Sequence, residues 1–229
     1  MAKLLIKFPS RSRPAKFMEV FNLYRSMASG KHQVKFLLSF DLDDPTMNNP
    51  GIRNWVAKQE HGVKAFWGNS KTKIEAINAD LQHAEDYDVM LLASDDMFPQ
   101  VAGYDDIIIQ DMNKHYPDGD GVLHYNDGKQ GERLNTLCIM GKKYFDRFGY
   151  IYNPEYKSVF CDNEFTDVSR MLGKATYIDN MLIRHYWIEI GIDALYMRNE
   201  NRELYAHDNA VYNRRKEAGF GLTQNANAS

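Results

Sequence analysis

Residues 88–97, DVMLLASDDM, place two adjacent carboxylates directly after an apolar run. Asp95 and Asp96 repel each other when both are ionised, so the pair raises the free energy of the charged forms. A divalent cation beside them reverses this balance, because its charge outweighs the repulsion and lowers both pKa values. Oxygen ligands from few residues are typical of Mg²⁺ or Mn²⁺ with coordination positions left open for phosphate oxygens and water. The pair therefore predicts a metal site that holds a phosphate-bearing substrate.

The alternative interpretation makes Asp95 a helix N-cap and Asp96 a solvated residue of the first helical turn. The next four residues, MFPQ, begin no helical pattern, so neither carboxylate has an evident helix to cap.

A second acidic run, SFDLDDPTM, places Asp41 and Asp43 after another apolar segment. This Asp-x-Asp spacing is how aspartyl-phosphate phosphatases position a nucleophile and an acid/base. Here Pro45 stands where such a site has Thr or Val, and no downstream lysine motif completes it. We therefore interpret Asp41 as a hydrogen-bond acceptor for a ribose or base. Neither a Walker A pattern nor GxGxxG is present, so metal and side chains must bind any phosphate.

The elements that position these residues follow from the hydrophobic pattern. Apolar runs of strand length alternate with segments of helical period, which predicts parallel strands joined by crossover helices. The strand-like runs are residues 4–8, 34–40, 63–67, 88–93, 121–125 and 136–140. Helices are predicted over 15–28, 74–81, 104–115 and 165–172, with Gly173 ending the last.

Polar residues follow the first four predicted strands. Because parallel strands end at the same edge of a sheet, where ligands of such folds bind, we expect these residues to share one rim. They are Ser10, Arg11, Arg13, Asp41, Asp43, Asn69, Asp95 and Asp96.

Composition bounds the class of protein. A chain of 229 residues can bury the core of one large α/β domain. Cys138 and Cys161 are its only cysteines and no signal-peptide pattern is present, so a reducing cytoplasm is the expected compartment. No apolar run approaches the roughly 20 residues of a membrane-spanning helix. The formal charge of −3 gives no bulk attraction to nucleic acid.

Four features of the sequence together resemble the nucleotide-sugar glycosyltransferases of the GT-A fold, in particular the large inverting family of compact phage and bacterial type. They are the turn FPSRSRP, Asp41, the segment GNSKTKIEAIN and the triplet SDD, and the resemblance extends over residues 3–190. It implies that nucleotide or sugar contacts come from Ser10, Arg11, Arg13, Asp41, Lys73, Asn78 and Asp95. It also implies that Asp96 binds Mn²⁺ or Mg²⁺ directly, and that Asp95 reaches the ribose or the metal. The first position of the triplet is Ser94 rather than Asp, which departs from the family's Asp-x-Asp.

The segment KSVFCDNEFTDVSRMLGK resembles the acceptor-side motif of the same family. The resemblance makes Asp162 the general base and Glu164 its backup, with Cys161 where the family usually has Glu. A second interpretation, compatible with the first, makes Asp162 an N-cap. In IRHYW, His185 matches the imidazole that some members use as an additional metal ligand; the alternative is a packed or hydrogen-bonded histidine.

These observations predict a mixed, mainly parallel α/β sheet with helices on both faces, a GT-A-like fold in one domain over residues 1–218. Residues 1–115 form its donor half, 116–190 its acceptor half and 191–218 a C-terminal helical segment, followed by a flexible tail at 219–229. The implied activity is metal-dependent, inverting transfer from a nucleoside diphosphate sugar, with a UDP-sugar as first choice, to a hydroxyl acceptor.

Two acceptor classes are open, a glycan and a modified base in DNA. Sugars and bases both stack on aromatic rings, and the acceptor half contains Tyr125, Tyr150, Tyr152, Tyr156, Tyr186 and Trp187. Packing is the ordinary use of such tyrosines. A DNA acceptor would require a basic face beside the site, from Arg198, Arg202, Arg214, Arg215 and Lys216.

Two other functions compete. A sugar-phosphate nucleotidyltransferase would have a Gly-rich loop after the first strand, and FPSRSRP has no glycine. A non-catalytic nucleotide-sugar or glycan-binding module is suggested by Cys161 in place of Glu.

Overall fold

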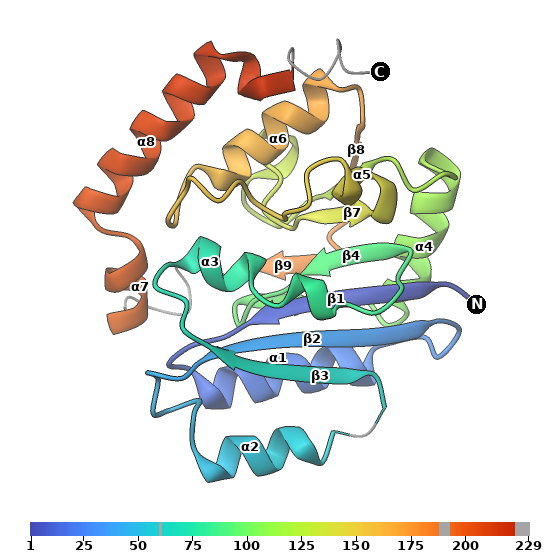
Figure 1. Ribbon diagram of the computed structural model, residues 1–229. Helices are drawn as coiled ribbons and strands as arrows, with labels where there is room; N and C mark the ends of the chain where they lie inside the picture. The colour runs from blue at the N-terminus through green and yellow to red at the C-terminus, as the bar shows by residue number, and fades with distance from the viewer. Residues whose placement is uncertain (60, 188–192, 223–229) are drawn as a thin grey trace.

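The computed structural model describes residues 1–59, 61–187 and 193–222. Its strands form a seven-stranded sheet in the order β3-β2-β1-β4-β7-β6-β8 and a two-stranded sheet, β5-β9 (Figure 1). The strands are β1 (Lys3–Pro9), β2 (Gln33–Asp41), β3 (Val63–Gly68), β4 (Val89–Leu92), β5 (Met97–Pro99), β6 (Val122–Tyr125), β7 (Ile139–Gly141), β8 (Ala175–Ile178) and β9 (Ile183–His185). The helices are α1 (Pro14–Ser26), α2 (Pro50–Ala57), α3 (Lys73–Asn78), α4 (Tyr104–His115), α5 (Lys142–Asp146), α6 (Cys161–Met171), α7 (Ala194–Asn199) and α8 (Arg202–Glu217), with 3-10 turns η1 (Leu81–His83) and η2 (Gly131–Arg133).

The first four predicted strands of the sheet are confirmed as parallel. β1 pairs with β2 and β4, and β2 pairs with β3, all in parallel. The parallel prediction is wrong for the run 136–140, because β7 is antiparallel to both β4 and β6. Between β6 and β7 the chain forms only the short turn η2, and a parallel return needs a crossover of a dozen or more residues that is usually a helix. β8 then pairs in parallel with β6.

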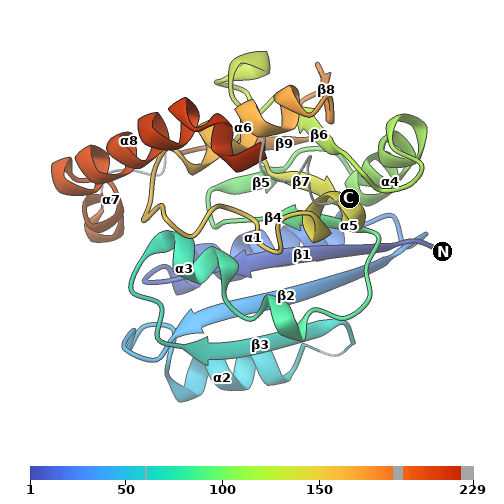
Figure 2. The same ribbon diagram turned by 45° about the horizontal axis from the view of Figure 1, so that its top comes forward.

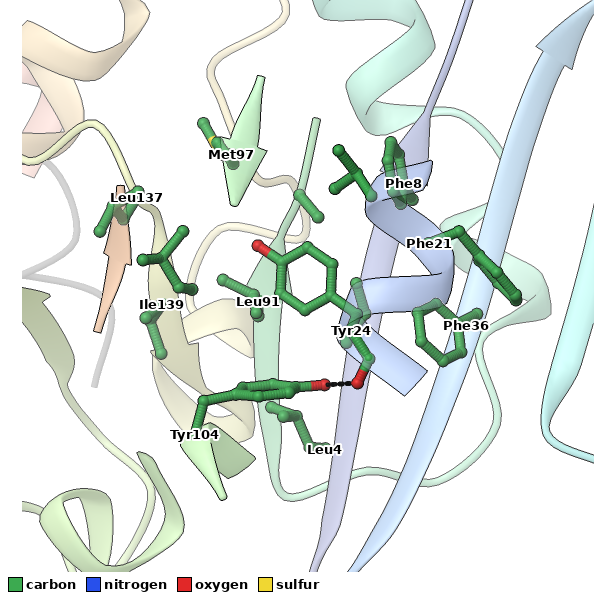
Figure 3. Packing of buried hydrophobic residues seen from close by; sticks show 14 of the residues in the cluster. Leu4, Phe8, Phe21, Tyr24, Phe36, Leu91, Met97, Tyr104, Leu137 and Ile139 are labelled. Atoms are coloured by element: carbon green, nitrogen blue, oxygen red, sulfur yellow. Dashed lines mark hydrogen bonds between the residues drawn. The ribbon is translucent and has the colours of Figure 1, made fainter. Parts of the chain in front are cut away.

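Alternate residues of β1 face opposite layers of helices. Leu4, Ile6 and Phe8 pack with α1, α2 and α4, whereas Leu5 packs with the layer that contains α3, α5, α6 and α8. Figure 3 shows the first layer, where Tyr104 of α4 donates a hydrogen bond of 2.9 Å to the backbone oxygen of Tyr24 on α1. Helices on both faces of the sheet confirm the predicted mixed α/β architecture.

The helix α2 has no counterpart in the sequence-based prediction. Its core-facing residues are Ile52, Trp55 and Val56, which span little more than one turn and are too few to show a period. Its start is instead fixed by Asn49, whose side chain accepts a hydrogen bond from the Ile52 backbone, and by Pro50 at the first helical position.

The last two helices lie on the side of the sheet where β1 to β4 end (Figures 1 and 2). The tail predicted at 219–229 is described only as far as residue 222. In that part Phe220 is buried and packs against Tyr212 of α8. None of the helices in the described ranges is long and apolar enough to cross a membrane.

One buried charge interrupts the second layer. Lys7 of β1 is fully buried, and its ammonium donates a hydrogen bond to the hydroxyl of Ser39 on β2. Ser39 donates in turn to a carboxylate oxygen of Asp80, 2.5 Å away. Burial lowers the pKa of Lys7 to about 7, and the nearby charge of Asp80 opposes this change only in part.

The Lys7→Met variant is expected to change how stability depends on pH. The unfolded chain keeps the Lys7 proton up to its ordinary pKa of 10.5, whereas the folded protein releases it near pH 7. Between these values the unfolded state binds one more proton, so the unfolding free energy of the wild type should rise relative to the variant by about 1.4 kcal/mol per pH unit. Urea denaturation from pH 7 to 9.5 measures this slope.

The control is Lys58→Met at an exposed position after α2, which should keep the wild-type slope. Parallel pH profiles for the wild type and Lys7→Met would show that Lys7 titrates as an ordinary lysine.

Candidate functional site

A cleft of about 430 Å³ lies at the edge of the sheet where the parallel strands end. Its walls come from the ends of β1, β2, β4 and β9, from α3 and α7, and from the loop that leads into α6. Nine of the predicted site residues line it: Ser10, Arg11, Arg13, Asp41, Lys73, Asp95, Asp96, Asp162 and His185. Residues far apart in the sequence therefore meet where the strand-end argument expected them.

At the β1 and β2 end of the cleft, Arg11 joins two carboxylates. Its Nη1 lies 2.9 Å from an oxygen of Asp41 and 2.5 Å from one of Asp43. The hydrogen bond and charge of Arg11 lower the pKa of Asp43. The other oxygen of Asp41 accepts the backbone N–H of Ser70, at 3.1 Å. Asp41 is thus a buried acceptor with fixed orientation, as recognition of a nucleoside requires.

Arg13 connects the carboxylate pair to α7. Its Nη1 lies 3.0 Å from Asp95, while its Nε and Nη2 bind both oxygens of Asp193, at 2.6 and 2.8 Å. Asp193 also caps α7 by accepting the backbone N–H of Tyr196. Burial and the charge of Asp96 raise the pKa of Asp95 to about 6, although Arg13 opposes them. Because Arg13 donates a hydrogen bond to Asp95, one oxygen of this carboxylate is already occupied.

Asp96 has different partners. Its Oδ2 lies 3.5 Å from Nε2 of His185, and its Oδ1 accepts a hydrogen bond from the Ser94 hydroxyl. Burial tends to raise the pKa of Asp96, but the bonds from His185 and Ser94 and the charge of Lys73 outweigh it and lower the pKa to about 2. The antiparallel pairing of β5 with β9 makes this contact, since it sets Met97 opposite His185. Neither carboxylate caps a helix, because both lie in a turn that leads directly into β5.

The residues present fit a hard divalent ion. Across the described ranges, no three His, Cys, Asp or Glu side chains converge as a fully protein-ligated ion would require. Mg²⁺ and Mn²⁺ sites instead use one or two protein ligands and complete the shell with substrate phosphates and water. Asp96 supplies an ionised carboxylate and His185 an imidazole beside it, at the wall of an open cleft.

Asp162 lies in the first turn of α6 and lines the cleft. It is not the N-cap, which is Phe160, so the capping interpretation is wrong. Burial raises the pKa of Asp162, and the positive charge of Lys73 limits the rise. A carboxylate with a raised pKa is a stronger proton acceptor, which suits a general base.

Lys73, the first residue of α3, links the two carboxylates electrostatically. Lys73 is an exposed residue whose pKa is raised: desolvation of the ammonium opposes the change, but the charges of nearby acidic groups, among them Glu200, Asp96 and Asp162, outweigh it. A charged lysine that interacts electrostatically with both Asp96 and Asp162 is suited to bind an anionic group.

Two predicted site residues do not line the cleft. Both oxygens of Glu164 bind Arg215 of α8, at 2.7 and 2.8 Å, and one also accepts the Tyr156 hydroxyl. The oxygen of Asn78 accepts the backbone N–H of Ile151, at 3.0 Å. Asn78 thus joins α3 to the loop at residue 151, and Glu164 joins α6 to α8.

Several lining residues were not among the predicted site residues. The loop before α6 contributes Ser158 and Phe160. Its backbone N–H groups at 157, 158 and 159 all donate to Asp208, a fully buried carboxylate of α8, at 2.8 to 3.0 Å. From α7, the residue that follows it and α8 come Leu195, Tyr196, Arg198, Asn199, Glu200 and Tyr205. Their part in the cleft depends on how the last helices fold back, which no local pattern encodes.

Comparison with protein-family models finds no match for this sequence, and no curated protein matches it. Solved structures do match. A mannosyltransferase from Pyrobaculum calidifontis in complex with GDP-Man and Mn²⁺ has a TM-score of 0.65 at 12% identity, with 86% of this chain and 60% of that chain covered. S. aureus TarS has a TM-score of 0.57 at 14% identity, with coverage of 79% and 36%.

A mutant of a Drosophila β1,4-galactosyltransferase 7, in complex with manganese, UDP-Gal and xylobiose, has a TM-score of 0.51 at 12% identity. This match covers 88% of the present chain and 81% of that one. The chain thus spans 60% of the mannosyltransferase and about a third of TarS. These likenesses confirm the predicted GT-A-like fold.

Proposed function

We propose that this protein is a metal-dependent glycosyltransferase that moves a sugar from a nucleoside diphosphate sugar to a hydroxyl acceptor with inversion. The observation that carries the proposal is that the Asp96–His185 pair and Asp162 line one cleft at the carboxyl ends of the parallel strands. Two proteins of similar fold were solved with such donors and with manganese, one with GDP-Man and one with UDP-Gal.

The proposed donor lies along the rim formed by β1, β2 and β4. Arg11 and Asp41 contact the nucleoside, with Asp41 held by the Ser70 backbone. Lys73 binds the diphosphate by charge. Asp96 and His185 hold Mn²⁺ or Mg²⁺, which supplies Lewis-acid stabilisation of the diphosphate leaving group.

Asp162 is the proposed base. The acceptor oxygen forms a bond to the anomeric carbon on the face opposite the diphosphate, and the carbon–oxygen bond to the diphosphate breaks. The proton of the acceptor hydroxyl passes to the Asp162 carboxylate, a transfer that requires hydrogen-bond reach.

Thermal unfolding with nucleoside diphosphates tests the donor site. UDP, GDP, CDP and TDP are each added alone and with Mn²⁺. A ligand at about 100 times its dissociation constant adds about 2.7 kcal/mol, which is roughly 5–10 °C in Tm for a chain of this size. We expect one nucleotide, UDP first, to give this shift only when Mn²⁺ is present.

A shift that is equal with and without Mn²⁺ would contradict the metal site. No shift with any pair would remove the nucleotide-sugar proposal. Binding without turnover against any acceptor would favour the non-catalytic binding module.

A further inference from the structure

An exposed aromatic ring lies at the mouth of the cleft. Tyr205 of α8 is 59% exposed, yet it lines the cleft. Its ring meets the ring of Phe160 at a centroid distance of 5.0 Å and an interplanar angle of 64°. Phe160 also stacks on Tyr212, at 5.7 Å and 29°. We call Phe160 and Tyr205 the aromatic ledge; Tyr212 supports it from behind.

The position of Phe160 is tightly fixed. Its φ of 61° is left-handed, a conformation that a bulky residue adopts only where its surroundings enforce it. The enforcing contacts are the three backbone hydrogen bonds from residues 157–159 to Asp208. Asp162 follows Phe160 by two residues and lines the same cleft. Phe160 and the proposed base are therefore held in a constant relation by one short stretch of backbone.

Three of the five basic residues that a DNA acceptor would need are paired with acidic groups of the protein. Arg214 and Arg215 pair with Glu155, and Arg215 also pairs with Glu164. Lys216 lies 3.6 Å from Asp167. None of these three cations lines the cleft, whereas Arg198 does. Binding of a nucleic acid backbone depends on several cations that contact phosphates, so this arrangement favours an acceptor without phosphates.

Most of the aromatic residues that the sequence offered for stacking are used in other ways. Tyr125 and Tyr156 are buried, with the Tyr125 hydroxyl bonded to Asp111 and that of Tyr156 to Glu164. Of the six, only Tyr152 and Trp187 line the cleft, and Tyr152 is itself buried. Trp187 and Tyr196 also line the cleft, but both are half-buried, so Tyr205 has the most exposed ring of the aromatic residues that line it.

We propose that the aromatic ledge is an acceptor subsite that binds the sugar ring of a carbohydrate and presents one of its hydroxyls to Asp162. This inference rests on the proposed function. An aromatic face carries partial negative charge and attracts the C–H face of a sugar ring, while the ring buries apolar area. The site therefore takes an uncharged glycan rather than DNA.

Saccharide binding to Tyr205 variants tests the subsite. The probes are xylobiose, cellobiose, lactose and maltose, titrated by NMR in the presence of Mn²⁺ and the nucleoside diphosphate that binds. We expect at least one disaccharide to bind, Tyr205→Ala to weaken it about three- to tenfold, and Tyr205→Phe, which keeps the ring, to bind within about twofold of the wild type. Met171→Ala, an exposed position of α6 away from the cleft, should bind as the wild type does.

The same samples separate two kinds of failure. Metal-dependent nucleotide binding with no disaccharide binding would overturn the subsite and leave the proposed function in place. Equal disaccharide affinity in the wild type and Tyr205→Ala would overturn it as well, as would tighter binding of a ten-nucleotide oligothymidylate than of any disaccharide. Tyr205-dependent disaccharide binding without nucleotide binding would instead support the subsite and remove the transferase.

Discussion

Replacement of Asp162 with asparagine is expected to lower kcat for sugar transfer by about 10³-fold and to leave metal-dependent nucleotide binding unchanged. Asparagine keeps the size of the side chain but cannot accept the proton of the acceptor hydroxyl. The donor contacts that we propose come from other elements, namely the ends of β1, β2 and β4 and the start of α3. Donor binding should therefore survive the loss of the base.

The measurement is the initial rate of transfer, together with nucleotide binding by calorimetry. Wild-type activity should fall as the pH drops through the raised pKa of Asp162, because only the ionised carboxylate accepts a proton. This acidic limb should be absent from the residual activity of the variant.

Two matched variants on the same helix are controls. Asp167→Asn changes a carboxylate that accepts the Tyr212 hydroxyl outside the cleft, and it should retain the wild-type kcat. Glu164→Gln weakens the bonds to Arg215 and should lower Tm more than kcat. Near-wild-type turnover by Asp162→Asn would rule out Asp162 as the base. A selective loss of kcat in Glu164→Gln would instead assign that role to Glu164.

The strands that the sequence predicted correctly are those with local signatures. β1, β2, β3 and β4 are apolar runs separated by helical segments or turns, and alternation of this kind indicates a parallel sheet. β7 runs in the reverse direction because no crossover helix lies between residues 126 and 138. The apolar pattern of that segment does not predict this absence. The short strands β5 and β9 have three residues each, too few for any periodicity.

The same distinction holds for the cleft. Polar residues directly after predicted strands could be placed from topology alone, because parallel strands end together. The contact of Asp96 with His185 could not be predicted in this way, because it requires the pairing of β5 with β9, which are separated by almost ninety residues. The interpretation of Asn78 and Glu164 as site residues followed motif position, and the structure bonds both side chains to the protein itself. Tyr205 lies on a helix whose polar sequence marks no site.

Replacement of Asp96 with alanine is expected to abolish the part of nucleoside diphosphate affinity that depends on metal. Loss of a partner behind a metal ligand already costs 10- to 100-fold in metal affinity, so loss of a direct ligand should cost at least about 100-fold. The weak, metal-independent affinity should persist, since Arg11, Asp41 and Lys73 are unchanged. The thermal shift series measures both components when Mn²⁺ is varied at constant nucleotide concentration.

The structure also supplies the reason why this variant should fold. Asp96 raises the pKa of Asp95 by repulsion, so its removal relieves an unfavourable interaction within the pair. The variant loses the bonds to Ser94 and His185, which are side chains at the wall of an open cleft. Asp43→Ala is the matched control, because it deletes an exposed carboxylate of the same rim that pairs with Arg11, and its Mn²⁺ dependence should remain. If Asp96→Ala kept the Mn²⁺ dependence while Asp43→Ala lost it, the ion would bind at the end of β2 instead. Asp95 and Asp96 would then pair only with side chains of the protein and not with a metal.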